Sequence, residues 1–208
     1  MNAKKQMSEA ERDSHHAERM AKRKAARERM LATKTEGKGL LMVHTGKGKG
    51  KSTAAFGLAV RAMGNDMRVG VVQFVKGKWQ TGERAILEHF PERVTIRSMG
   101  EGFTWDTQDR QRDIAAAKAA WQAACEMMGD DSYDLIVLDE LNIVLRYDYL
   151  PLADIVGALE GRRDGLHIVV TGRNAKQELI DAADMVTEMS EIKHHFKAGV
   201  KAQTGIEF

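Results

Sequence analysis

The chain has 208 residues, 43% of them hydrophobic and 30% charged, which is enough for one α/β domain and an additional arm but not for two ordinary domains. Its formal net charge of +2 is too small to indicate nucleic-acid binding by itself. A single cysteine, Cys125, excludes an intrachain disulfide, and no apolar run reaches the ~18 residues of a membrane span. Because the N-terminus is polar and carries no secretory signal, we expect a soluble, cytoplasmic protein.

Residues 1–38 differ in composition from the rest of the chain. They contain eleven lysines and arginines against six acids, a charge of +5, which leaves −3 for residues 39–208. Large hydrophobic residues are few in this segment, so a helix formed there has almost no apolar face to bury. We expect a basic N-terminal arm that is flexible or conditionally helical. A nucleic-acid-binding arm is the alternative, and the mixed signs of its charges argue against it.

Residues 39–208 alternate apolar runs with helix-forming segments. Strands are expected at 40–44, 68–75, 94–97, 134–139, 167–171 and 185–189, and helices at 51–64, 81–90, 107–129, 151–162 and 176–183. Thr81 is a candidate cap of the second helix, and Asp106 and Thr107 are candidate caps of the third. The repeated βα units predict an α/β, P-loop (RecA-like) three-layer fold, with a mainly parallel sheet and helices on both faces.

A run of glycines and lysines at 45–53 lies between the first strand and the first helix, which is the context of a phosphate-binding P-loop. Glycines allow backbone N–H groups to surround an anion, and the helix N-terminus adds unpaired donors. We predict that Lys51 contacts phosphate oxygens and that the Ser52 hydroxyl ligates Mg²⁺. Thr45 stands where the usual pattern has its first glycine, which indicates a loop wrapped differently around the phosphates. The alternative is a surface turn that binds nothing.

Charged residues follow two later strands. Asp139 and Glu140 end the strand at 134–139, and Arg173 follows the strand at 167–171. Because ligands bind at the carboxyl ends of parallel strands, we expect Asp139 to hold Mg²⁺ through water and Glu140 to ligate the metal or orient a substrate. Mn²⁺ is an alternative metal. The alternative to a binding site is that the two acids are solvated carboxylates at the strand end and that Arg173 is a surface arginine after a turn. The expected nucleotide-binding residues are Thr45, Gly46, Lys47, Gly48, Lys49, Gly50, Lys51, Ser52, Thr53 and Arg173.

Three further groups of residues are candidates for binding. The segment 73–79 ends the second strand with two lysines and an aromatic residue, which favours contact with an anion or a planar ligand. Phe103 and Trp105 lie in a glycine-containing loop, where large aromatic side chains either attach the loop to the core or form an apolar wall for a ligand. His194 and His195 form only a weak metal-site pattern, because no third ligand accompanies them in the sequence.

Several of these stretches, in order from about residue 39 to the C-terminus, resemble the P-loop corrinoid adenosyltransferases, also called cob(I)yrinic acid a,c-diamide adenosyltransferases. They are TGKGKGKSTAA (45–55), VQFVKGKW (72–79), GFTWD (102–106), VLDEL (137–141), YDYLPL (147–152), VTGR (170–173) and FKAGVKAQTG (196–205). GFTWD (102–106) and FKAGVKAQTG (196–205) are the most specific of these motifs. Thr45 agrees with the family, whereas Lys47 and Ser52 stand where Asn and Thr are usual.

The resemblance implies transfer of the 5′-deoxyadenosyl group of ATP to cobalt(I) of a corrinoid, with release of triphosphate, in adenosylcobalamin synthesis or salvage. It implies that ATP lies in the loop in the reverse of the usual direction. Lys51, Ser52 and Glu140 are then catalytic residues of the triphosphate and Mg²⁺ site. Phe103 and Trp105 match the family residues that displace the lower axial ligand of the corrinoid, which makes cobalt(II) easier to reduce.

The resemblance also implies partners. It predicts a homodimer in which the basic arm closes over the corrinoid, and a reduced flavin or flavodoxin-type electron donor. Two other functions remain open from the residues alone: a RecA-like P-loop ATPase or kinase whose arm binds nucleic acid, and a nucleotide-binding regulator without chemistry. The identity of the product separates them, because only the adenosyltransferase releases intact triphosphate.

Overall fold

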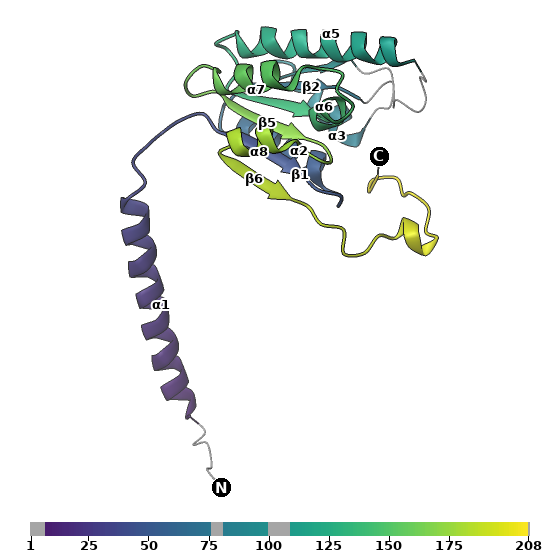
Figure 1. Ribbon diagram of the computed structural model, residues 1–208. Coiled ribbons are helices and arrows are strands. Elements are labelled where there is room, and N and C mark those ends of the chain that lie inside the picture. The colour runs from purple at the N-terminus through teal and green to yellow at the C-terminus, as the bar shows by residue number, and fades with distance from the viewer. Residues whose placement is uncertain (1–6, 76–80, 100–108, 208) are drawn as a thin grey trace. The chain divides into compact units, whose positions relative to one another are not determined.

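The computed structural model describes residues 7–75, 81–99 and 109–207 (Figure 1). The chain forms two units, residues 1–37 and 38–208. The expectations for 76–79 and for Phe103 and Trp105 fall outside the described residues. No helix among the described residues is long and apolar enough to cross a membrane.

The first unit contains helix α1, Glu9–Ala32. Its start is defined by a capping box in which the Glu11 N–H donates to the Ser8 hydroxyl at 3.3 Å and the Ser8 N–H donates to the Glu11 carboxylate at 2.8 Å. None of its residues is buried, as expected for a helix with almost no large hydrophobic residues. The helix therefore rests on local hydrogen bonds and helix-forming residues rather than on packing within its own unit.

The second unit is built on a sheet whose described strands are all parallel, in the order β3-β2-β4-β5-β1-β6. Their bounds are β1 Leu41–Thr45, β2 Val69–Gln73, β3 Val94–Ser98, β4 Leu135–Asp139, β5 His167–Thr171 and β6 Met185–Glu188. Strand β1, which precedes the phosphate loop, is separated from β4 by β5. Because the strands are parallel, their carboxyl ends meet at one edge of the sheet, toward which β5 and β6 point in Figure 1.

Helices cover both faces of this sheet. Their bounds are α2 Lys51–Met63, α3 Gly82–Leu87, α5 Arg110–Met128, α6 Leu141–Arg146, α7 Leu152–Glu160 and α8 Gln177–Ala182, with a 3₁₀ turn η1 at Phe196–Ala198. Successive strand residues point to opposite faces: Val43 and Leu138 pack with α5 to α8, whereas Met42 and Val137 pack with α2 and α3. Each large apolar side chain buried in this way contributes ~1.5–3 kcal/mol. The predicted three-layer α/β fold is confirmed.

Three local predictions need correction. Helix α5 begins at Arg110, not at 107, and is capped by Asp109, whose carboxylate accepts hydrogen bonds at 3.1 Å from the N–H groups of Gln111 and Arg112. The predicted caps, Asp106 and Thr107, lie outside the described residues. Thr81 occupies the cap position of α3, but its side chain makes no capping hydrogen bond. Helix α6 was not predicted, because it follows β4 after the single residue Glu140, which turns the chain with a left-handed φ of 64°.

Candidate active site

The phosphate loop joins β1 to α2 and requires its glycines for two reasons. Gly46 and Gly50 have φ values of 96° and 101°, which disfavour any side chain. A Cβ on Gly46 or Gly48 would also lie 2.5 or 2.7 Å from the backbone oxygen of Met189, which follows β6. Thr45 is the last residue of β1, and its hydroxyl accepts a hydrogen bond from the Ala175 N–H at 3.0 Å. A threonine at this position thus connects β1 to the turn after β5, which a glycine could not do.

Lys51 is the first residue of α2, and its side chain points back into the loop. The residue is buried, and its ammonium group donates a hydrogen bond to the Gly48 carbonyl. Loss of solvent lowers the pKa of Lys51; Arg173 and Lys49 lower it further, while Glu140 opposes them. Several positive charges and a helix N-terminus therefore converge here, and an anion bound among them would relieve their mutual repulsion.

The acidic part of the site lies at the end of β4 and is held by neighbouring strands. Asp139 is fully buried and accepts hydrogen bonds from the Thr171 hydroxyl at 2.8 Å and the Gln73 amide at 3.3 Å. The Thr171 hydroxyl also accepts a hydrogen bond from the Glu140 N–H at 2.9 Å. One hydroxyl of β5 thus positions both acids. Glu140 is only partly exposed and is close enough to Lys51 to raise its pKa.

This network extends across the sheet to β3. The Ser98 hydroxyl donates to the Gln73 side-chain oxygen at 2.7 Å, and Arg84 of α3 donates to Ser98 at 3.0 Å. The sequence placed Gln73 and Thr171 at the ends of their strands, but it did not predict that these two residues, with Ser98 and Arg84, position the acids. The available signal was a polar residue at the carboxyl end of an otherwise apolar strand, as at Gln73 in VGVVQ and Thr171 in HIVVT.

The remaining predicted residues surround the same edge of the sheet. Arg173 is exposed on the turn after β5, whose Gly172 carbonyl accepts a hydrogen bond at 3.0 Å from the buried Asn142. Ser52 is partly exposed at the start of α2, and Thr53 is exposed. A cavity of about 820 Å³ opens beside the loop and is lined by Thr45, Gly46, Lys47, Arg173, Asn174, Ala175, Ile180, Glu188, Ser190, Glu191, His194, Phe196 and Lys197. The fold therefore brings the loop, Glu140 and Arg173 to one place.

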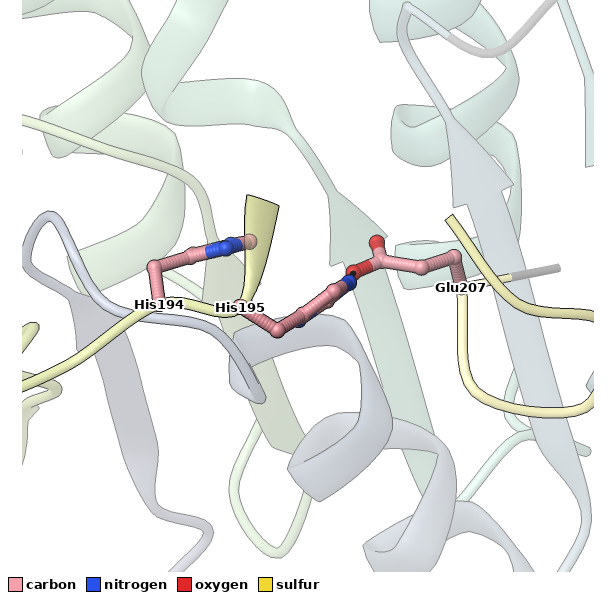
Figure 2. Close-up of side chains that lie close together, drawn as sticks. All are labelled: His194, His195 and Glu207. Carbon is pink, nitrogen blue, oxygen red and sulfur yellow. Dashed lines mark ion pairs between the residues drawn. The ribbon is translucent and has the colours of Figure 1, made fainter. Parts of the chain in front are cut away.

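The histidine pair has a third partner that the sequence did not reveal. His194, His195 and Glu207 each offer one possible metal-ligand atom, and these atoms lie within 4.8 Å of one another (Figure 2). Glu207 is also ion-paired with Lys49 of the phosphate loop. The cluster connects the C-terminal segment to the nucleotide site.

Comparison with known proteins agrees with this geometry. The family model "ATP:corrinoid adenosyltransferase BtuR/CobO/CobP" matches residues 37–208. A corrinoid adenosyltransferase of Pseudomonas aeruginosa is 53% identical over 198 residues, covering 95% of this chain and 98% of that protein. The corrinoid adenosyltransferase CobA of Salmonella typhimurium is 45% identical over 196 residues, covering 94% of this chain and 99% of that protein.

Among solved structures, the RadB recombinase aligns with a TM-score of 0.47 and 13% identity over 76% of this chain and 77% of its own. The sequence comparisons are far stronger, since they extend over nearly the whole of both proteins. They confirm the resemblance seen in the sequence motifs, and the family match includes the phosphate loop, Asp139, Glu140 and Arg173. The chain therefore belongs to the ATP:corrinoid adenosyltransferase family.

Proposed function

We propose that this ATP:corrinoid adenosyltransferase uses its phosphate loop to hold the three phosphates of ATP as the leaving group. The observation that carries the proposal is Lys51, a buried ammonium at a helix N-terminus whose pKa is lowered by loss of solvent and by neighbouring cations. Such a site stabilises concentrated negative charge, which is what a departing triphosphate brings. Arg173 and Lys49 add charge to the same site. The loop residues 46–50 supply backbone N–H groups in this proposal, except Gly48, whose N–H donates to the Met189 carbonyl.

In the proposed reaction, cobalt(I) of the corrinoid attacks C5′ of ATP with its electron pair. A cobalt–carbon bond forms, the bond from C5′ to the α-phosphate oxygen breaks, and that electron pair leaves with triphosphate. Because the substrate is itself the nucleophile, the protein needs no nucleophilic side chain. The chain's contribution is to orient C5′ toward cobalt and to stabilise the leaving group. Lys51 and the loop N–H groups do the latter.

The oxygen donors at the site fit Mg²⁺, with Mn²⁺ as an alternative. Mg²⁺ prefers a few protein oxygens together with phosphate oxygens and water. The Ser52 hydroxyl and the Glu140 carboxylate, both partly exposed, would hold the metal. Asp139 would hold the metal through water, because its buried carboxylate already accepts hydrogen bonds from Thr171 and Gln73. When bound, the metal neutralises charge on the phosphates.

The corrinoid side of the reaction rests on the family motifs. Phe103 and Trp105 occupy the motif GFTWD, and in this proposal they displace the lower axial ligand of cobalt(II). The arm, residues 1–38, closes over the corrinoid in a homodimer, and a reduced flavin or flavodoxin-type donor supplies the electron. The proposed location is the cytoplasm, where the single free cysteine, Cys125, stays reduced.

Product identity tests the proposal. The protein is incubated in the dark with ATP, Mg²⁺ and a corrinoid reduced chemically to cobalt(I). Intact triphosphate and a light-sensitive cobalt–carbon product should appear in equal amounts. Release of orthophosphate or pyrophosphate in place of triphosphate would show that the phosphates do not leave as one unit and would contradict the proposed role of the loop.

A further inference from the structure

The C-terminal segment, residues 190–207, returns to the phosphate loop. It begins next to the loop, where the Gly48 N–H donates to the Met189 carbonyl at 2.6 Å. Gly199 and Gly205 have φ values of 82° and 80° and provide the tight turns by which the segment reverses, as its yellow trace shows in Figure 1. The segment also contributes His194, Phe196 and Lys197 to the wall of the cavity beside the loop.

The end of the segment is attached to the loop by Glu207. Its N–H donates to the Gln203 carbonyl at 2.9 Å, which holds the last turn. Its side chain is only 13% exposed, and its Oε2 accepts a hydrogen bond from the Lys49 ammonium. Its Oε1 lies 3.5 Å from Nε2 of His195, as Figure 2 shows for the two side chains. Lys49 first, and both histidines, lower the pKa of Glu207, so the carboxylate is ionised at neutral pH. The two bonded residues are 158 positions apart in the chain.

The same cluster has the residue types of a metal site, but its charges favour another role. The Lys49 ammonium lies at the carboxylate that a metal ion would have to share. A divalent cation there would face this ammonium at close range, and like charges disfavour such binding. The arrangement is instead that of an ion pair which connects the end of the chain to the phosphate loop.

We propose that Glu207 is a positioning residue of the nucleotide site, which orients Lys49 and holds the C-terminal segment as a wall of the cavity. This inference rests on the proposed role of the loop in holding triphosphate. Glu207 acts through Lys49 and does not touch ATP itself. Its loss should therefore weaken ATP binding and leave the bond-making step intact once ATP is bound.

The test is Glu207→Gln in the full chain, which keeps the shape of the side chain and removes its charge. KM for ATP should rise about two- to fivefold, the range expected for one partly exposed ion pair, while kcat changes by less than about twofold. Glu207→Asp keeps the charge on a shorter side chain, so its KM for ATP should lie between those of the parent protein and Glu207→Gln. The matched control is Glu126→Gln, which removes the Arg97–Glu126 ion pair on β3 and α5 and should leave KM unchanged.

Two further measurements separate this role from a merely structural one. In Lys49→Met, adding Glu207→Gln should raise KM no further, because the partner is already absent. Trypsin should cleave after Lys193, Lys197 and Lys201 faster in Glu207→Gln than in the parent protein, because the segment is released. Additive effects on KM or equal cleavage rates would overturn the inference.

Other outcomes are equally decisive. If the parent protein releases triphosphate but Glu207→Gln leaves KM for ATP unchanged, this inference fails and the proposed function stands. If the parent protein releases no triphosphate, the proposed function itself fails. Zn²⁺ alone is also titrated into chelator-treated protein. Stoichiometric binding that His195→Ala abolishes would assign the cluster to a metal and overturn the ion-pair role.

Discussion

The buried charge of Lys51 links the stability of the protein to the phosphate-binding role proposed for the loop. Its pKa is lowered in the folded protein, mainly by loss of solvent, so the unfolded chain binds more protons in the pH window between this lowered pKa and the ordinary value of 10.5. Its charge thus costs stability at neutral pH, and this cost disappears as the pH rises above the unfolded value. We predict that Lys51→Met keeps or raises the Tm of the ATP-free protein and loses the Tm increase caused by ATP. Thermal unfolding with and without ATP measures both effects.

The control for this variant is Lys118→Met, a lysine exposed on α5. It should keep the full ATP-induced increase in Tm. A normal increase in Lys51→Met would mean that Lys51 does not contact the phosphates. A large fall in the Tm of the ATP-free variant would mean that the hydrogen bond to Gly48 outweighs the cost of the buried charge.

The backbone of Gly48 lies close to the backbone of Met189 and Ser190, and a substitution at Gly48 tests this contact. A Cβ at this position would lie 2.7 Å from the Met189 oxygen and 2.8 Å from the carbonyl of Ser190, so one of the two segments must move. We predict that Gly48→Ala weakens ATP binding by at least about tenfold, measured by calorimetry. Gly57→Ala is the matched control: nothing lies within 4 Å of the new Cβ in α2, and the variant should gain ~0.5–1 kcal/mol of stability with normal binding. Normal ATP binding in Gly48→Ala would show that the loop adjusts freely.

At the scale of elements, the carboxyl ends of β2, β4 and β5 form one hydrogen-bonded unit. Thr171→Val removes the donor to Asp139 and the acceptor of the Glu140 N–H while keeping the shape of the side chain. We predict a loss of ~1–3 kcal/mol of unfolding free energy, because buried polar groups lose their partner, and a lower kcat. Denaturant unfolding and steady-state kinetics measure these.

Thr187→Val on the exposed strand β6 provides the control for the same chemical change. It should alter neither the unfolding free energy nor kcat by a measurable amount. If Thr171→Val lost stability but kept its full kcat, the network would support the sheet without positioning Glu140.

The motif with Phe103 and Trp105 belongs to the same scale, since it follows β3 in the sequence. We predict that the double variant Phe103→Ala/Trp105→Ala loses most of its activity when the assay starts from cobalt(II) and much less when cobalt(I) is supplied chemically. The reason is that displacing the lower ligand of cobalt assists its reduction and not the later transfer. The comparison of the two assays is the measurement, and equal losses would leave these residues a packing role only.

For the whole molecule, the division into residues 1–37 and 38–208 predicts independent folding of the second unit. No residue of α1 is buried, and the apolar core lies in residues 41–179. A chain of residues 38–208 should therefore have a Tm within about 2 °C of that of the full chain, which corresponds to a difference in unfolding free energy of less than ~1 kcal/mol. Calorimetry measures this difference. The proposed role of the arm predicts that the shortened chain also has a higher KM for the corrinoid, whereas an unchanged KM would remove the arm from the corrinoid site.

Much of the candidate site could be predicted from local patterns in the sequence. The glycines and lysines of 45–53 lie between an apolar run and a helix-forming run, and a chain with that order has few alternatives to a phosphate loop. The acids at the end of β4, Asp139 and Glu140, and Arg173 after β5 were expected at the same edge, and the parallel sheet places them there. Local pattern was weaker at element ends: the candidate caps of α5 were predicted three and two residues before Asp109, and α6 was overlooked because only Glu140 separates it from β4.

By itself, the sequence determined the α/β class, the place of the phosphate loop and the family, because these depend on glycine dihedrals, apolar periodicity and short motifs that neighbouring residues encode together. Only the tertiary structure decided which strands are neighbours, and hence that Thr171 and Gln73 hold Asp139. It also decided that Glu207 meets Lys49. Such contacts depend on strand order and on the reversal of the chain over long distances, which no local pattern specifies.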